Sequence, residues 1–155
     1  MVVGIAPVLI ALLSFILRLA DLGRVKGFIF DEVYYVDGAR DLLKYGVEVA
    51  GSKPEFIVHP PLGKWLIGLG IQVFGDTGFG WRFTTALIGS LMILLIALIA
   101  HRLFRSAVLT ALASALMAID GLALVHSRTA LLDNFLTFFV LLSSYLFLTI
   151  RYWWT

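Results

Sequence analysis

Residues 83–100 read FTTALIGSLMILLIALIA, a run of 18 residues without a charged side chain. A helix of about 20 mostly apolar residues is long enough to cross the hydrocarbon core of a bilayer. The whole chain has 155 residues, of which 61% are hydrophobic and 14% are charged. A soluble domain has about 25% charged residues, so the sequence predicts an all-α membrane protein.

Three further apolar stretches predict more crossings and complete a single membrane domain over residues 1–155. The four predicted transmembrane helices lie at about residues 2–22, 83–100, 107–125 and 135–150. Asp120 and Gly121 interrupt the third of them. An ionisable residue inside a crossing is usually functional or paired, so Asp120 is expected either to find a partner or to cap the next segment.

A polar stretch at residues 23–80 separates the first two crossings and predicts two short helices at the membrane surface. The first runs from about residue 32 to 45, with Asp31 as its N-cap and Gly46 after its end. The second, at about 61–74, begins at a Pro pair and is short and rich in Gly. We therefore expect it to lie at the interface, with a fifth crossing as the alternative.

The positions of the arginines predict the orientation of the chain. With four crossings, Arg102, Arg105 and Arg151 share one side, and the excess of positive charge in cytoplasmic loops makes that side the inner one. A fifth crossing would turn Arg102 and Arg105 outward, so four crossings fit better. The outer face of the cell membrane then carries six polar side chains of interest, Asp31, Glu32, His59, Lys64, Arg128 and Asp133.

The adjacent acids Asp31 and Glu32 are the first candidates for chemistry. Neighbouring residues of a helix point about 100° apart, so the two carboxylates cannot share one task. One could accept a proton while the other binds substrate or orients a partner. The alternative is structural, with Asp31 as an N-cap only and Glu32 as a favourable charge in the first turn.

Three basic side chains on the outer face have two interpretations each. Arg128 suits a lipid phosphate through paired hydrogen bonds, or it forms an ion pair with Asp133 or Asp120. Lys64 could help to bind phosphate, or its ammonium group could extend to the interface. His59 could bind a divalent metal together with the carboxylates, but a lone His is a weak metal signal and a structural role is favoured.

Several classes of function are excluded by what the sequence lacks. The net charge of +2 and the absence of a basic tract give no support to nucleic-acid binding. There is no Cys, so disulfides and thiolate metal sites are excluded. The motifs of phosphate-binding loops, zinc proteases and hydrolase nucleophile elbows are absent as well.

Four blocks of sequence follow one another in a known order. They are Phe30-Asp31-Glu32-Val33-Tyr34-Tyr35, His59-Pro60-Pro61-Leu62-Gly63-Lys64, Gly80-Trp81-Arg82-Phe83 and Ser127-Arg128-Thr129-Ala130-Leu131-Leu132-Asp133. In this the chain resembles the protein O-mannosyltransferases, the dolichyl-phosphate-mannose–protein mannosyltransferases of glycosyltransferase family 39, which have the GT-C membrane fold. Aminoarabinose transferases also carry an acidic pair and a Pro-Pro-Leu block, but the His before the Pro pair favours the mannosyltransferases.

The resemblance implies an enzyme that moves mannose from a polyprenyl phosphate to a Ser or Thr hydroxyl of a protein, on the outer side and with inversion. It implies Asp31 as the catalytic base, Glu32 as a supporting or substrate-binding acid, and Arg128 facing the lipid phosphate. Lys64, His59 and Asp133 join Arg128 as candidate substrate-binding residues. It also implies two juxtamembrane helices in the first outer loop. It identifies no definite cofactor, and a divalent metal stays open.

The chain departs from the family pattern in two respects. Tyr34-Tyr35 stands where eukaryotic members often have His-Phe, which indicates a bacterial or archaeal donor lipid rather than dolichol. Family members are also several times longer, so the chain is expected to be an N-terminal piece of such an enzyme. The rival interpretations are another lipid-linked sugar transferase, of the arabinose or aminoarabinose type, and a non-catalytic membrane subunit or transporter piece.

Overall fold

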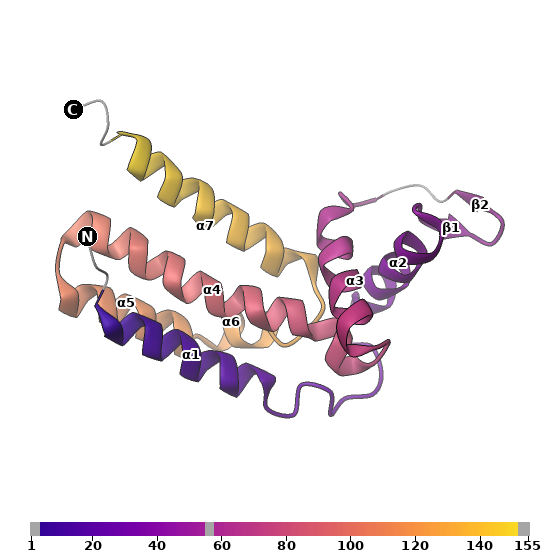
Figure 1. The fold of residues 1–155 in the computed structure, drawn as a ribbon, viewed down its shortest axis with the longest axis horizontal. Helices are drawn as coiled ribbons and strands as arrows, with labels where there is room; N and C mark the ends of the chain where they lie inside the picture. The colour runs from indigo at the N-terminus through magenta and orange to yellow at the C-terminus, as the bar shows by residue number, and fades with distance from the viewer. Residues whose placement is uncertain (1–3, 55–57, 152–155) are drawn as a thin grey trace.

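The computed structural model describes residues 4–54 and 58–151, and most of these residues are helical (Figure 1). The helices are α1 (Ile5–Leu19), α2 (Glu32–Tyr45), α3 (Leu62–Phe74), α4 (Gly78–Phe104), α5 (Ala107–Ile119), α6 (Gly121–His126) and α7 (Leu132–Arg151). Two short strands, β1 (Val49–Ala50) and β2 (Lys53–Pro54), pair antiparallel between α2 and α3. Val49 lies opposite Pro54, and Ala50 lies opposite Lys53.

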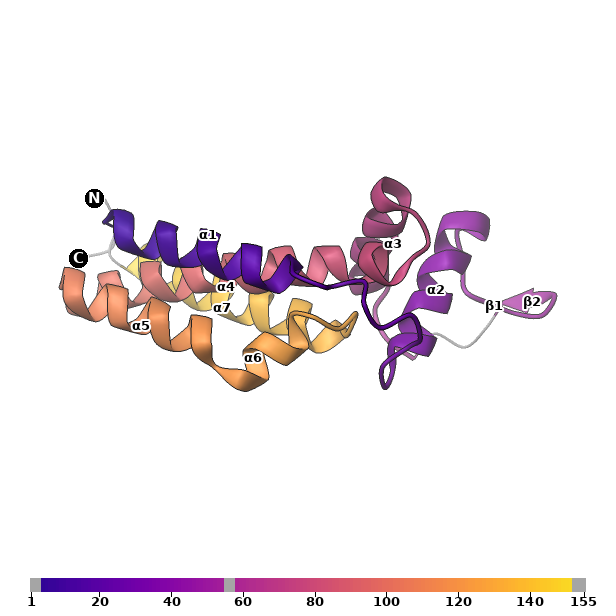
Figure 2. The same cartoon turned by 90° about the horizontal axis from the view of Figure 1, so that it is seen from below.

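The helices form an elongated bundle with a smaller group of elements at one end. Helix α4 is central, and it contacts α1, α5 and α7 along the bundle and α3 at its beginning. Figures 1 and 2 show α2, α3 and the strand pair together at this end, beyond the ends of α1 and α7. The polar stretch therefore folds as a cap on the bundle, and α3 packs against both α2 and α4.

Two of the helices are long and apolar enough to cross a membrane. They are Gly78–Phe104, in which an 18-residue segment has a mean hydropathy of 2.5, and Leu132–Ile150, in which such a segment has a mean hydropathy of 1.5. Helices α1, α3 and α5 are apolar but shorter. Large apolar side chains such as Leu13, Leu116 and Phe147 are exposed on the outside of the bundle. Lipid would cover such a surface, whereas water would leave it prone to aggregate.

The helix boundaries follow local signals in the sequence. Helix α2 ends at Gly46, which adopts a left-handed conformation with φ of 73° and closes the helix with a backbone hydrogen bond to Leu42. The apolar stretch at 107–125 divides into α5 and α6 at Asp120. The Asp120 carboxylate accepts a hydrogen bond from the Ala123 amide at 2.7 Å, so this acid caps α6.

Helix α3 lies unusually close to the beginning of α4. A Cβ atom built on Gly70 would lie 2.2 Å from the carbonyl oxygen of Gly80, which is far inside van der Waals contact. The two backbones therefore touch where neither residue has a side chain. Since Lys64 belongs to α3, this contact also fixes the position of one candidate site residue.

We expect Gly70→Ala to lower the apparent melting temperature of the full-length protein in detergent. The new methyl group must push α3 away from α4, and overpacking of this kind costs about 1–3 kcal/mol. Gly121→Ala is the matched control, because a Cβ atom there meets no heavy atom within 4 Å. Equal melting temperatures for the two variants would show that α3 and α4 are not in backbone contact.

Candidate active site

Asp31 lies at the start of α2 but does not use its side chain as a cap. It holds the N-cap position of α2, yet its side chain accepts no capping hydrogen bond, contrary to the structural interpretation of this acid. Its Oδ2 atom instead accepts a long hydrogen bond of 3.5 Å from the Tyr35 hydroxyl. The preceding residue, Phe30, has a positive φ of 52°, a strained conformation for a residue with a side chain.

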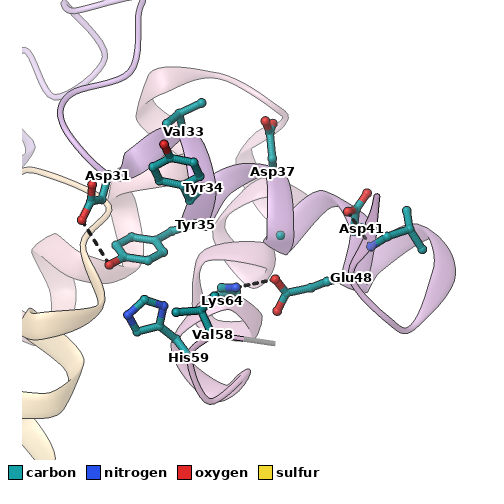
Figure 3. A pocket seen from close by; sticks show the side chains of 12 residues that line it. Asp31, Val33, Tyr34, Tyr35, Asp37, Asp41, Glu48, Val58, His59 and Lys64 are labelled. Atoms are coloured by element: carbon teal, nitrogen blue, oxygen red, sulfur yellow. Dashed lines mark hydrogen bonds and ion pairs between the residues drawn. The ribbon is translucent and has the colours of Figure 1, made fainter. Parts of the chain in front are cut away.

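Asp31 lines an open cavity of about 550 Å³ between α2, the strand segment and the start of α3 (Figure 3). The cavity unites three residues that the sequence predicts for the site, Asp31, His59 and Lys64. The remaining lining residues are Val33, Tyr34, Tyr35, Asp37, Gly38, Asp41, Glu48, Val49 and Val58. A volume of this size is within the range of about 300–1,000 Å³ that is usual for small-molecule sites.

A second, smaller cavity of about 240 Å³ adjoins the first and is mostly apolar. It runs onto α7, where Leu132, Phe135, Leu136 and Phe139 line it together with Asp133. Tyr35 and His59 line both cavities, and their rings meet edge to face with centroids 5.4 Å apart. These two rings therefore form the boundary between a polar space and an apolar one.

Tyr35 is held in its protonated form by its surroundings. Burial, and next the negative charges of Asp31 and Asp133, raise the pKa of the Tyr35 phenol above its ordinary value. The hydroxyl therefore keeps its proton at neutral pH and acts as a donor toward Asp31. This contact orients the carboxylate at the mouth of the cavity.

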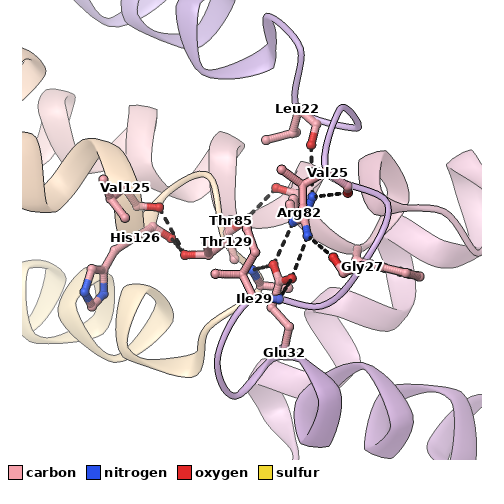
Figure 4. A network of polar contacts seen from close by, with 12 residues as sticks. Leu22, Val25, Gly27, Ile29, Glu32, Arg82, Thr85, Val125, His126 and Thr129 are labelled. Atoms are coloured by element: carbon pink, nitrogen blue, oxygen red, sulfur yellow. Dashed lines mark hydrogen bonds and ion pairs between the residues drawn. The ribbon is translucent and has the colours of Figure 1, made fainter.

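Glu32 is buried in an ion pair with Arg82, away from the cavity (Figure 4). Its two oxygens accept hydrogen bonds from Nε and Nη2 of Arg82 at 2.7 and 2.6 Å. They also accept hydrogen bonds from the backbone amides of Ile29 and Ala130, at 2.8 and 2.7 Å. Arg82 in turn donates to the carbonyl groups of Leu22, Val25 and Gly27.

This arrangement gives Glu32 a positioning task. Its carboxylate joins the loop after α1, the start of α2, the start of α4 and the loop before α7. All four of its hydrogen bonds go to the protein itself. Asp31 is the next residue along the chain, so the Glu32 network fixes the point from which the Asp31 carboxylate projects.

Arg128 lies at the end of α1 rather than in either cavity. Its Nη1 and Nη2 atoms donate hydrogen bonds to the carbonyl oxygens of Leu17 and Ala20, each at 2.7 Å. Neither Asp133 nor Asp120 is among its hydrogen-bond partners in the described part of the chain, so the ion-pair interpretation finds no support there. Carbonyl groups at the end of a helix have no partner within the helix, and a cation is favourable near them.

Lys64 is buried rather than extended toward the interface. It is 4% exposed and forms an ion pair and hydrogen bond with Glu48. Glu48 was not identified from the sequence, because the two residues are 16 positions apart and meet only when the strand pair folds back between α2 and α3. The Asp41 carboxylate accepts a hydrogen bond from the Val49 amide at 3.1 Å, which holds this segment against α2.

The family described as dolichyl-phosphate-mannose-protein mannosyltransferase has a sequence model that matches residues 58–152. This chain belongs to that family. The resemblance drawn from the four sequence blocks is therefore confirmed.

Relatives within and near this mannosyltransferase family cover most of the chain. The polyprenol-phosphate-mannose–protein mannosyltransferase of Mycobacterium tuberculosis is 45% identical over 138 residues, which are 85% of this chain and 26% of that protein. The protein of the same name from Corynebacterium glutamicum is 43% identical over 118 residues, which are 72% of this chain and 23% of that protein. The chain thus spans about a quarter of the length of these curated relatives.

A relative with a different sugar is also found. The undecaprenyl phosphate-alpha-4-amino-4-deoxy-L-arabinose arabinosyl transferase of Pseudomonas paraeruginosa is 38% identical over 119 residues, which are 73% of this chain and 21% of that protein. No solved structure matches the chain.

In this member of the mannosyltransferase family, His59 contacts an aromatic ring, and within the described residues it belongs to no cluster of possible metal ligands. Within residues 4–54 and 58–151, no three His, Asp or Glu side chains are grouped so that they could hold a metal ion. His59 contacts the ring of Tyr35 instead. Of the six residues expected on the outer face, Asp31 and Lys64 line the polar cavity, Asp133 lines the apolar cavity and His59 lines both. Glu32 and Arg128 line neither cavity and form hydrogen bonds with other parts of the protein.

Proposed function

We propose that this chain is part of an enzyme that transfers mannose from a polyprenyl-phosphate-mannose lipid to Ser or Thr hydroxyls of proteins. The observation that carries the proposal is the position of Asp31. Asp31 is half-buried, its carboxylate is not used as a cap, and it lines the polar cavity. It accepts a hydrogen bond from Tyr35, whose side chain also lines the apolar cavity. The names of the mycobacterial and corynebacterial relatives support the same donor lipid and acceptor class.

Asp31 acts in this proposal as the general base. It takes the proton of the acceptor hydroxyl while the hydroxyl oxygen attacks the anomeric carbon of the mannose. The bond between that carbon and the phosphate oxygen breaks, and the prenyl phosphate leaves with the electron pair. A single displacement inverts the anomeric centre, so one base suffices and no sugar–enzyme intermediate forms.

The membrane arrangement that fits this chemistry has four crossings of a GT-C type fold. Helices α1, α4 and α7 would provide three, and α5 with α6 would provide the fourth. Helix α3 has 13 residues and is about 20 Å long at 1.5 Å per residue, less than the hydrocarbon core of about 30 Å. It would therefore lie with α2 at the outer face, where both cavities open.

Arg128 is proposed to face the phosphate of the donor lipid. It is half-buried at the outer end of α1, and two of its guanidinium nitrogens are held by carbonyl groups. A guanidinium fixed in this way offers its three remaining N–H bonds and its full charge to a phosphate. Charge on the departing phosphate grows as the sugar leaves, so a fixed cation stabilises the transition state.

For Arg128→Ala in the full-length enzyme, we expect the KM for the lipid donor to rise about tenfold to hundredfold. A hydrogen bond to a charged group contributes about 1.5–3 kcal/mol, and about 1.4 kcal/mol is a factor of ten. Arg24→Ala is the control, because Arg24 is an exposed arginine of the same outer stretch. If both kcat and the KM for the donor are unchanged in Arg128→Ala, the phosphate role is ruled out, whatever happens to stability.

The aminoarabinose relative supports one alternative, the transfer of a different lipid-linked sugar. The full-length enzyme in proteoliposomes should be given polyprenyl-phosphate-mannose with a Ser/Thr peptide and, in parallel, an undecaprenyl-phosphate aminoarabinose donor with a lipid acceptor. We expect transfer in the first reaction alone. Transfer only in the second would replace the proposed function, and transfer in neither would favour a non-catalytic membrane subunit.

A further inference from the structure

The polar cavity contains an oxygen atom for which the protein supplies no partner. Glu48 is 6% exposed, and its Oε2 atom accepts a hydrogen bond from Lys64. Its other oxygen, Oε1, is buried and has no hydrogen-bond partner among the residues that the structure describes. Buried acceptors are almost always satisfied by a protein group, an ordered water or a ligand. Glu48 lines the cavity, so this oxygen belongs to a side chain in the cavity wall.

The Glu48–Lys64 pair is held in a built site rather than at a mobile surface. Helix α2 presents Gly38 to the pair, and a Cβ atom there would lie 2.9 Å from Oε2 of Glu48 and 3.1 Å from Nζ of Lys64. Any side chain at position 38 would displace the pair. The hydrogen bond from the Val49 amide to Asp41 holds the residue next to Glu48 against α2. The unpartnered oxygen therefore has a fixed position.

The charge of the cavity decides which chemical class it accepts. Four carboxylates line it, those of Asp31, Asp37, Asp41 and Glu48, against the single ammonium group of Lys64. This excess of negative charge repels phosphate, whereas neutral hydroxyl groups are good donors to carboxylate oxygens. The aromatic side chains of Tyr34 and Tyr35 and the ring of His59 add flat faces for the C–H surface of a sugar ring.

We propose that the 550 Å³ cavity binds the hexose of the donor lipid, with Oε1 of Glu48 accepting a hydrogen bond from one sugar hydroxyl. This inference rests on the proposed function and adds to it a residue that determines sugar specificity. Figure 3 shows Asp31 and Glu48 on different sides of Tyr35 in the cavity lining. A sugar between them would have its anomeric carbon near Asp31 and a distant hydroxyl on Glu48. The prenyl chain would leave along the apolar cavity on α7.

The chemistry of the pair also predicts what an isosteric change would do. In Glu48→Gln, the ammonium group of Lys64 requires an acceptor, so the amide oxygen must face Lys64. The amide nitrogen then faces the cavity, and the acceptor for the sugar hydroxyl has become a donor. A site built to bond a hydroxyl strongly rejects an analogue that lacks it. In Glu48→Gln, the sugar hydroxyl can only accept a neutral hydrogen bond from the amide in place of its bond to the carboxylate, so this discrimination should weaken.

The test uses the full-length enzyme with polyprenyl-phosphate-mannose and its 2-, 3-, 4- and 6-deoxy forms, with a Ser/Thr peptide as acceptor. For the wild type, we expect one deoxy donor to have a kcat/KM at least tenfold below that of the parent donor. For Glu48→Gln, we expect the parent donor to lose most of this factor, so that kcat/KM for the two donors becomes nearly equal. Asp76→Asn is the control, since its carboxylate lies outside the cavity lining and is about half exposed, and it should keep the discrimination.

Four results would overturn the inference. The wild type could use all the deoxy donors within twofold of the parent, or Glu48→Gln could discriminate as the wild type does. Glu48→Gln could also change the KM for the peptide and leave the donor ratio intact, which would assign the oxygen to the acceptor. If the wild type transfers no mannose at all, the proposed function fails together with this inference. If the Glu48→Gln protein cannot be produced in folded form, Glu48→Asp is used instead, because it keeps the negative charge but moves the carboxylate oxygens away from the sugar. The ratio of kcat/KM for the parent and deoxy donors is then measured for Glu48→Asp.

Discussion

Asp31→Asn in the full-length enzyme should lower kcat for mannosyl transfer by about 10²- to 10⁴-fold, the usual contribution of a positioned general base. The amide cannot take the proton of the acceptor hydroxyl. It has the same size as the carboxylate, and its oxygen can still accept the hydrogen bond from Tyr35. We therefore expect the KM for the lipid donor and the melting temperature to stay close to those of the wild type.

Asp37→Asn is the matched control for this change. Asp37 lines the same cavity from the same helix, but its carboxylate is largely exposed and paired with Arg40. Arg40 keeps its second partner, Asp76, when Asp37 is neutralised. Steady-state kinetics on both variants separate a base from a general effect of negative charge in the cavity. Wild-type turnover in Asp31→Asn would rule out the role given to Asp31.

The sequence predicted the local structure of the cap well because its signals are local. A Pro pair, a Gly at a helix end and a 14-residue stretch with polar and apolar faces place α2 and α3 within a residue or two of their observed bounds. The gathering of Asp31, His59 and Lys64 at one cavity also follows from the sequence, since all three lie in the same polar stretch between two apolar ones.

The pairing of distant charges could not be predicted in the same way. Nothing in the sequence indicates that Arg82 binds Glu32, 50 positions away, or that Lys64 binds Glu48. An arginine at the edge of an apolar run, as Arg82 is, usually extends its charge to the membrane interface. Arg82 is buried instead, since the loop after α1 folds over it and supplies three carbonyl acceptors. Which charged side chains pair over such sequence distances depends on how the helices and loops pack together, and not on local sequence propensity.

Glu32→Gln should be the most destabilising single change among α2, α3 and the strand pair. We expect it to lower the free energy of unfolding by about 3–5 kcal/mol, because the buried Arg82 loses its counter-charge. Gln has the same shape as Glu, so no cavity forms. Its amide group, however, replaces one acceptor by a donor where all four partners of Glu32 are N–H groups. At least one buried donor must then lose its acceptor.

Asp76→Asn is the control for the loss of an ion pair as such. Asp76 accepts two hydrogen bonds from Arg40, at 2.8 and 2.9 Å, and one from the Trp81 ring. The Arg40 and Asp76 side chains are about a third to a half exposed, so neutralising Asp76 should cost less than neutralising the fully buried Glu32. Thermal unfolding of the two full-length variants in detergent gives the comparison. If Glu32→Gln melts no lower than Asp76→Asn, the Glu32–Arg82 pair does not hold the cap together. If Glu32→Gln melts far lower and its kcat also falls, we infer that Glu32 affects the reaction by fixing the position of Asp31. The two adjacent acids then differ in role because, of the two, only Asp31 lines the cavity.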